Sequence, residues 1–199
     1  MGLVVKKGKD TPPVPEGVFQ GVCYALYDIG THFSEKWGKS AYQCIIIWEL
    51  PDARIELEKD GKALNLPRAV SKKYTMSIGE KSNLRKDLQS WRGKSFTAEE
   101  LDGFDITKLL GANCMIQIIH TTKDDKTYAN ISSITPLYKG MKKLEPENNI
   151  RYFSLAEHSE LPPNTPDWIT ELVKDSAEWK RDQPIEPDNI PEPESEVPF

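Results

Sequence analysis

Basic and aromatic side chains lie close together in one part of the sequence, and together they could bind single-stranded nucleic acid. Between residues 68 and 94, eight basic side chains stand against only two acidic ones, Glu80 and Asp87. Binding of a single strand requires a basic groove for its phosphates and aromatic faces on which bases stack, at about 1–3 kcal/mol per base. Tyr74, which follows Lys72 and Lys73, is therefore a candidate stacking residue.

A second aromatic candidate precedes this run. Trp37 lies in a polar, glycine-bearing loop (residues 31 to 40) beside Lys36 and Lys39, and it is the best candidate for stacking. The predicted nucleic-acid-binding residues are the two rings and the basic side chains near them: Lys36, Trp37, Lys39, Arg68, Lys72, Lys73, Tyr74, Arg85, Arg92 and Lys94.

Two other tryptophans are assigned to the core. Trp48 shares one face of a predicted strand with Cys44 and Ile46, and a face that carries Cys and Ile is typical of a core. Trp91 follows Leu84 at helical spacing, which places it on the apolar face of a helix over residues 81 to 91.

Catalysis has little support in the sequence, and we predict that the chain is not an enzyme. It contains no phosphate-binding glycine-rich loop, no nucleophile elbow and no Cys or His pair at metal-ligand spacing, so no catalytic residue, metal or cofactor is predicted. Pro51-Asp52 followed by Asp60-Gly61-Lys62 superficially resembles a metal-dependent nuclease motif. Asp60-Gly61 is better explained as the turn of a hairpin.

The order of the predicted elements indicates a mainly β fold with helical additions. Strands are expected over residues 17–30, 42–50, 69–78, 113–122 and 127–137, with helical segments between the third and fourth. A five-stranded barrel with this helical connection is the layout of the OB-fold, which binds nucleic acid across strands 2 and 3 and the loops beside them. The sequence therefore places the site at residues 37–50 and 68–78.

Four regions follow from the same pattern. We expect a flexible lead-in (1–16), the OB-fold domain (17–140), a helical extension (141–181) and a disordered acidic tail (182–199). The helix of the extension should begin at Pro166, with Thr165 as its cap. We expect it to pack on the barrel or on a second copy, and a homo-oligomer is left open.

Charge divides the chain in two. Residues 1–144 hold 22 Lys and Arg against 17 Asp and Glu, whereas residues 145–199 hold 4 against 14. A basic body with an acidic tail is typical of proteins that bind polyanions and carry an internal competitor. No apolar run reaches membrane-spanning length, no signal peptide is visible, and the three widely spaced cysteines are expected to be buried free thiols. These features favour a cytoplasmic location and no membrane partner.

The last residues, ESEVPF, are similar to the C-terminal tip of bacterial single-stranded DNA-binding proteins, an acidic stretch that ends in a hydrophobic residue, Pro and Phe. In that family the tip docks partner proteins, so the resemblance implies replication or recombination proteins as partners. The residues to which it transfers are Glu192, Glu194, Glu196, Val197, Pro198 and Phe199.

The body carries a second resemblance. EKSNLRKDLQSWRGKSFTAEELDGFDITKLLGANCMIQIIH, followed by YANISSITPL, resembles a family of small bacteriophage-encoded proteins, uncharacterised or associated with replication, over roughly residues 15 to 140. This resemblance implies a phage setting, in the host cytoplasm. Together with the basic and aromatic residues and the tip, it leads us to expect a phage single-stranded DNA-binding protein that coats strands without sequence preference and recruits partners through its tip. The alternative is a protein-interaction adaptor built on the same barrel, without significant affinity for nucleic acid.

Overall fold

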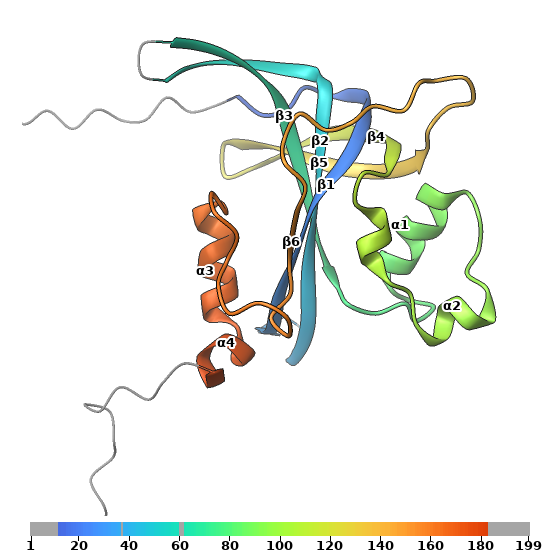
Figure 1. Ribbon diagram of the computed structural model, residues 1–199, viewed down its shortest axis with the longest axis vertical. Coiled ribbons are helices and arrows are strands. Elements are labelled where there is room, and N and C mark those ends of the chain that lie inside the picture. The colour runs from blue at the N-terminus through green and yellow to red at the C-terminus, as the bar shows by residue number, and fades with distance from the viewer. Residues whose placement is uncertain (1–11, 37, 60–61, 183–199) are drawn as a thin grey trace, which may run out of the picture.

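The computed structural model describes residues 12–36, 38–59 and 62–182, which form a six-stranded sheet with helices against both of its faces (Figure 1). The strands are β1 (Gly17–Ser34), β2 (Lys39–Lys59), β3 (Lys62–Thr75), β4 (Asn113–Lys123), β5 (Lys126–Pro136) and β6 (Arg151–Phe153). The helices are α1 (Asn83–Arg92), α2 (Ala98–Asp102), the 3-10 turn η1 (Ile106–Leu109), α3 (Asp167–Asp175) and α4 (Ala177–Asp182).

The sheet is open, although the sequence predicted a barrel. Its antiparallel strands follow the order β3-β2-β1-β4-β5, and β6 pairs in parallel with β1. Within the described part of the chain, β3 and β5 do not pair, so the mainly β class is confirmed but closure is not. Helix α1 bridges these two edges instead. Its Asp87 accepts a hydrogen bond from Tyr74 of β3, and its Ser90 donates one to the carbonyl of Ile134 in β5.

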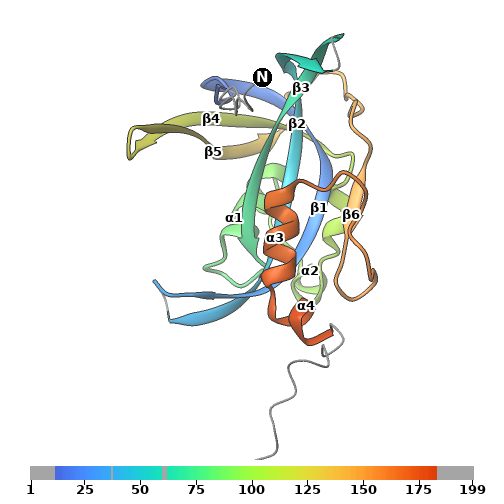
Figure 2. The same cartoon turned by 90° about the vertical axis from the view of Figure 1, so that its left-hand side faces the viewer.

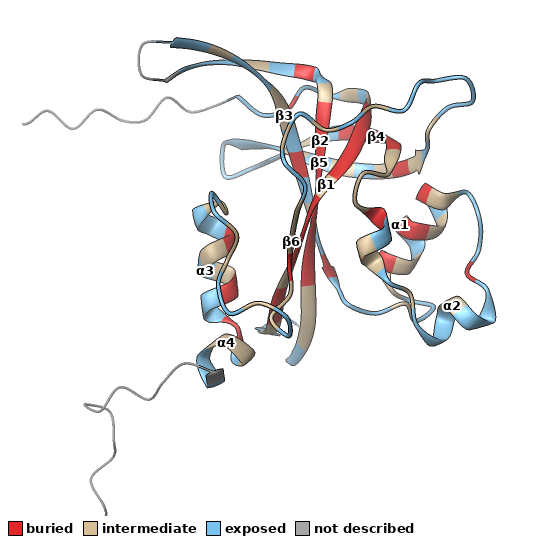
Figure 3. Ribbon diagram, in the orientation of Figure 1, coloured by how far each residue is buried: buried red, intermediate tan, exposed pale blue. Residues whose placement is uncertain are grey.

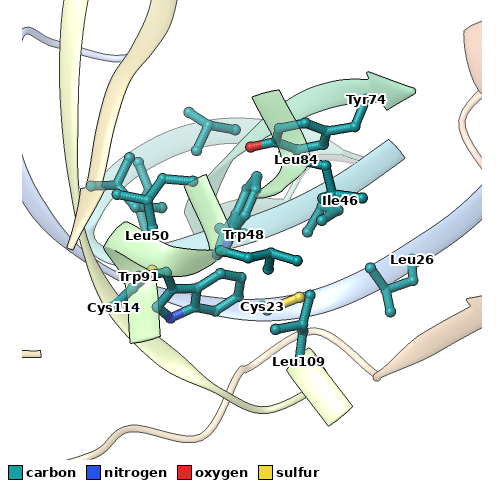
Figure 4. Packing of buried hydrophobic residues seen from close by; sticks show 14 of the residues in the cluster. Cys23, Leu26, Ile46, Trp48, Leu50, Tyr74, Leu84, Trp91, Leu109 and Cys114 are labelled. Carbon is teal, nitrogen blue, oxygen red and sulfur yellow. The ribbon is translucent and has the colours of Figure 1, made fainter. Parts of the chain in front are cut away.

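Helix α1 forms where the sequence predicted a helix, and it covers one face of the sheet. Ser82 caps its first turn, and Gly93 ends it in the left-handed region at φ 65°. Leu84, Leu88 and Trp91 are buried, and the Trp91 ring lies 5.6 Å from that of Trp48 (Figure 4). The assignment of both tryptophans to the core is therefore confirmed.

The opposite face of the central strands is also buried, as Figure 3 shows for β1 and β2. In β2, Ile46 and Trp48 point into the α1 side, whereas Ile45 and Ile47 pack with Val173 of α3. A strand buried on both faces explains the continuous apolar run of β2, because alternation is expected only where one face meets water. The expected packing of the extension on the sheet is confirmed.

Part of the predicted lead-in contacts the sheet. Val14 is buried in the core, and the carboxylate of Glu16 accepts a hydrogen bond from the amide of His120 in β4. On the other side, Arg68 of β3 donates to the carbonyl of Pro12. Residues 12–16 therefore contact both β3 and β4, and the flexibility of the lead-in stays a prediction. Residues 1–11 lie outside the described residues.

The helix of the extension begins one residue later than predicted, after a Pro166 cap, and is broken into two. Ser176 leaves the helical region at ψ 152° and separates α3 from α4. Its buried hydroxyl donates to the carbonyl of Val173 and accepts from the amide of Trp179. This side chain thus ends one helix and caps the next.

All three cysteines, Cys23, Cys44 and Cys114, are buried and free, as expected. Burial raises the pKa of each thiol, that of Cys44 to about 12, so these side chains stay protonated. Across the described ranges, no helix is long and apolar enough to cross a membrane.

Candidate nucleic-acid interface

The face of strands β2 and β3 where the sequence predicted binding is largely covered. Ile45 and Ile47 of β2 point away from α1, but they pack beneath Ile169 and Val173 of α3. Both isoleucines are almost fully buried. While the extension is in place, it closes this part of the sheet to a nucleic acid.

Tyr74 is not a stacking surface, and that prediction was wrong. Its side chain is only 3% exposed, and its hydroxyl donates to Asp87 of α1 at 2.7 Å. Burial raises the pKa of this hydroxyl well above its usual value, and the nearby carboxylate of Asp87 raises it further. Lys72 forms an ion pair with the same carboxylate at 2.6 Å. Packing of α1 over the edge of the sheet has therefore turned both side chains inward.

Arg92 is also used within the fold. Its guanidinium carbon lies 4.6 Å from the ring centre of Phe96 and 4.9 Å from that of Phe104. The group forms an ion pair with Glu100, which compensates its charge. Arg92 stabilises the turn after α1, and little of its charge remains for a phosphate.

Two further predicted arginines donate hydrogen bonds to backbone carbonyls. Arg68 donates to Pro12 and Arg54, and Arg85 donates to Ile78. Four predicted lysines remain exposed: Lys36, Lys39, Lys73 and Lys94. Trp37, the best stacking candidate, lies outside the described residues.

An open groove lies between the end of β3 and the start of α1. Its volume is about 710 Å³, and its lining is mostly polar and small. Lys73 and Lys81 line it, and Glu80 is its one acidic residue. The lining residues are Gln43, Lys73, Tyr74, Thr75, Ser77, Gly79, Glu80, Lys81, Ser82 and Asn83. The groove can accept an anionic chain of moderate width.

Two hairpins project on this side of the molecule, and each exposes an aromatic ring. Figure 2 shows the β1–β2 hairpin and the β4–β5 hairpin pointing in the same direction, with the β3–α1 loop between them in that view. Phe33, near the end of β1, is 65% exposed, and Tyr128, near the start of β5, is 48% exposed. The sequence analysis missed both rings.

Lysines accompany each of these rings. In the first hairpin, Lys39 pairs with Ser34, the neighbour of Phe33, and Lys36 lies in the turn. In the second hairpin, Lys123 pairs with Lys126 next to the turn, and Tyr128 follows two residues later. Asp124 and Asp125 form that turn and offset the two lysines, so the β4–β5 hairpin offers chiefly its ring. The positive charge comes from the first hairpin and the groove.

The C-terminal extension is attached close to the same groove. Glu178 of α4 accepts hydrogen bonds from the amide and the hydroxyl of Thr31, at 2.7 and 2.6 Å. The neighbouring Gly30 pairs with Gln43, which lines the groove. A Cβ atom at Gly30 would lie 2.6 Å from the Glu178 carboxylate, so this close approach requires glycine. The described chain therefore ends soon after a contact that lies beside the groove.

No family model, no curated protein and no solved structure matches this chain.

Proposed function

We propose that this protein binds single-stranded DNA with little sequence preference, across the two projecting hairpins and the groove. The observation that carries the proposal is the pair of exposed rings, Phe33 and Tyr128, one on each hairpin, with lysines beside the first of them. Exposed rings offer π-faces to any base, and lysines offer charge to any phosphate, so neither contact selects a sequence. Lys73 and Lys81 would contact the backbone between the hairpins.

The OB-fold is part of the proposal. The strand order and the helix between the third and fourth strands support it. The edge strands β3 and β5 both form hydrogen bonds with α1, which lies between them. OB-folds use the β1–β2 and β4–β5 loops as arms that enclose the strand. Here those two hairpins carry the exposed rings, and α3 covers the centre of the sheet. The strand would therefore be held mainly by the arms.

The acidic C-terminal segment would recruit replication or recombination proteins in a phage-infected cell. The support is the resemblance of Glu192, Glu194, Glu196, Val197, Pro198 and Phe199 to the tip of bacterial single-stranded DNA-binding proteins. These residues lie outside the described ones, so the proposal for them rests on the sequence.

The experiment is equilibrium binding of the full-length chain to a labelled oligonucleotide, single-stranded and as a duplex, over a series of salt concentrations. We expect a preference for the single strand, with an affinity that falls steeply as salt rises because counterions are released from the phosphates. Equal affinity for the duplex would contradict stacking on Phe33 and Tyr128. Absence of binding at low salt would support the adaptor hypothesis instead.

A further inference from the structure

A basic loop lies on the side of the molecule away from the two hairpins. Residues 137–144 form the first part of the connection from β5 to β6. They carry three lysines and no acidic side chain. Figure 1 shows this segment at the upper right, whereas the β4–β5 hairpin points left. Tyr138 is 56% exposed and Met141 is 39% exposed. The loop thus combines an aromatic ring, a thioether and positive charge at the surface.

Two polar side chains, one buried and one half-buried, hold the backbone of this loop. The amide group of Gln20, which is 5% exposed, donates to the carbonyl of Lys142 at 2.9 Å. Asn113 accepts from the amide of Leu144 and donates to its carbonyl, both at 2.9 Å. Gln20 and Asn113 are themselves joined by a 2.8 Å hydrogen bond. The loop is therefore positioned by a connected network and not only by its ends.

A buried carboxylate fixes the segment that follows. Glu49 of β2 is fully buried and accepts hydrogen bonds from the amides of Glu147 and Asn148, both at 2.8 Å. The side-chain amide of Asn148 donates to it as well, at 2.5 Å. Burying a carboxylate is costly unless such bonds compensate it, so this anchor indicates that the path of the segment is strongly specified.

These anchors use backbone groups and leave the lysine side chains in solvent. Lys139, Lys142 and Lys143 are exposed, and in the described ranges none of them forms an ion pair. Lys94 is exposed as well, and its backbone runs close to the start of the loop. It follows Gly93, where an added Cβ atom would lie only 3.0 Å from Pro136, the last residue of β5. An ordered backbone with three exposed lysines that form no ion pair binds an anion at a low entropic cost.

We propose that this loop, together with Lys94, is a second binding site for single-stranded nucleic acid, separate from the hairpins and the groove. The inference rests on the proposed function, because it applies the same recognition chemistry to a second surface. Tyr138 offers a face for a base, and the lysines lie where the adjoining phosphates would pass. One chain could then hold two strand segments, on opposite sides of the body.

The test counts binding sites per chain. An oligonucleotide of about eight thymidines, within the site sizes of a single OB-fold, is titrated into full-length protein at a concentration well above the dissociation constant. We expect two oligonucleotides per wild-type chain. The triple variant Lys139→Glu, Lys142→Glu, Lys143→Glu should bind one, and so should a hairpin variant with Phe33→Ala, Lys36→Glu and Lys39→Glu. Counting per chain makes the result independent of self-association.

Two further variants keep the count interpretable. A triple change to Gln at the same three lysines should also reduce the count to one, and its melting temperature should equal that of the wild type. A control with the same change in net charge, Lys86→Glu, Lys108→Glu, Lys174→Glu, reverses exposed lysines elsewhere and should still bind two.

Several outcomes would overturn the second site. One oligonucleotide per wild-type chain would reject it while leaving the proposed function intact, whereas no binding at all would reject both. A synthetic peptide of residues 183–199 provides the remaining comparison. If the loop variant loses the peptide but keeps both oligonucleotides, the loop takes an acidic protein segment and not a strand.

Discussion

Residues 72–74 of β3 and residues 126–128 of β5 have nearly the same composition, a tyrosine that follows one or two lysines, but opposite environments. Tyr74 is buried and bonded to Asp87, and Lys72 pairs with that carboxylate. Tyr128 is half exposed on a hairpin that projects from the body. The one pair of side chains stabilises the fold, and the other pair faces solvent.

The difference lies in what packs against each segment. Helix α1 is the next element after β3 and covers the last residues of that strand. Tyr74 therefore joins the core around Leu84 and Leu88. The same helix reaches β5 only at its far end, where Ser90 bonds to Ile134. Tyr128 lies near the opposite end of β5, beyond the helix. An aromatic ring that remains exposed to water is unfavourable for folding, whereas exposed lysines are ordinary. Such a ring is therefore more informative about binding than a lysine-rich stretch is.

The largest expected effect is on stability. Changing Tyr74 to Ala should lower the free energy of unfolding by about 3–5 kcal/mol, the usual cost of removing a large buried aromatic side chain. Tyr128→Ala should change it by less than about 0.5 kcal/mol, because that ring has little packing to lose. Urea denaturation of the two variants measures both values. Equal destabilisation would contradict the contrast between the two tyrosines.

The next effect is on oligonucleotide binding, where the exposed rings and not the buried Tyr74 should matter. Phe33→Ala and Tyr128→Ala should each weaken oligonucleotide binding by about 1–3 kcal/mol, which is roughly fivefold to 150-fold. The control is Trp168→Ala on α3, an exposed ring that stands between acidic residues and should not contribute. Fluorescence anisotropy with a labelled oligonucleotide gives the affinities. A loss in the control as large as in the hairpin variants would show that ring exposure alone is not the determinant.

A smaller effect concerns the anchor of the extension. Glu178→Gln should cost about 1 kcal/mol of stability, since it weakens the hydrogen bonds from Thr31. Burial pushes the pKa of the Glu178 carboxyl upward, but these hydrogen bonds outweigh it and hold the pKa below its usual value. A depressed pKa stabilises the fold above the pKa of the unfolded state, and this contribution is lost as the pH falls through the folded value.

The difference in stability between wild type and Glu178→Gln should therefore be constant near neutral pH and shrink on acidification below about pH 4, the normal range of a glutamate. Thermal unfolding at a series of pH values measures it. A difference that persists unchanged into acid would mean that the charge of Glu178 does not contribute.

The smallest expected effect is that of the acidic tail on oligonucleotide affinity. Truncation after Asp182 should raise oligonucleotide affinity a few fold at low salt and not at high salt. The reason is that the removed residues are acidic, are tethered near the groove and compete with phosphates at an effective concentration of about millimolar. Full-length and truncated protein are compared in the same salt series. Identical affinities at low salt would exclude this competition.

Much of the architecture could be predicted from local patterns. Helix α1, its caps and the buried Trp48 and Trp91 follow from apolar spacing and from Ser and Gly at the helix ends. The site could not be predicted in this way. Whether Tyr74 or Tyr128 meets solvent depends on where a helix from another part of the sequence packs, and neighbouring lysines do not reveal that.

The covered face of the sheet gives the same lesson. The predicted binding region included residues 37–50, but α3, more than a hundred residues later, packs on Ile45 and Ile47 within it. A signal was present in the sequence, because an unbroken apolar run predicts a strand buried on both faces. Phe33 and Tyr128 could have been found by asking which aromatic residues adjoin turns.

The central claim is that single-stranded DNA lies across the two hairpins. Ultraviolet crosslinking of a thymidine oligonucleotide to the full-length protein, followed by mass spectrometry of the crosslinked peptides, tests it directly. Crosslinks should fall in peptides that contain Phe33 and Tyr128, with none at Tyr74 or Trp168. Crosslinks at Trp168, with none in either hairpin peptide, would contradict the account.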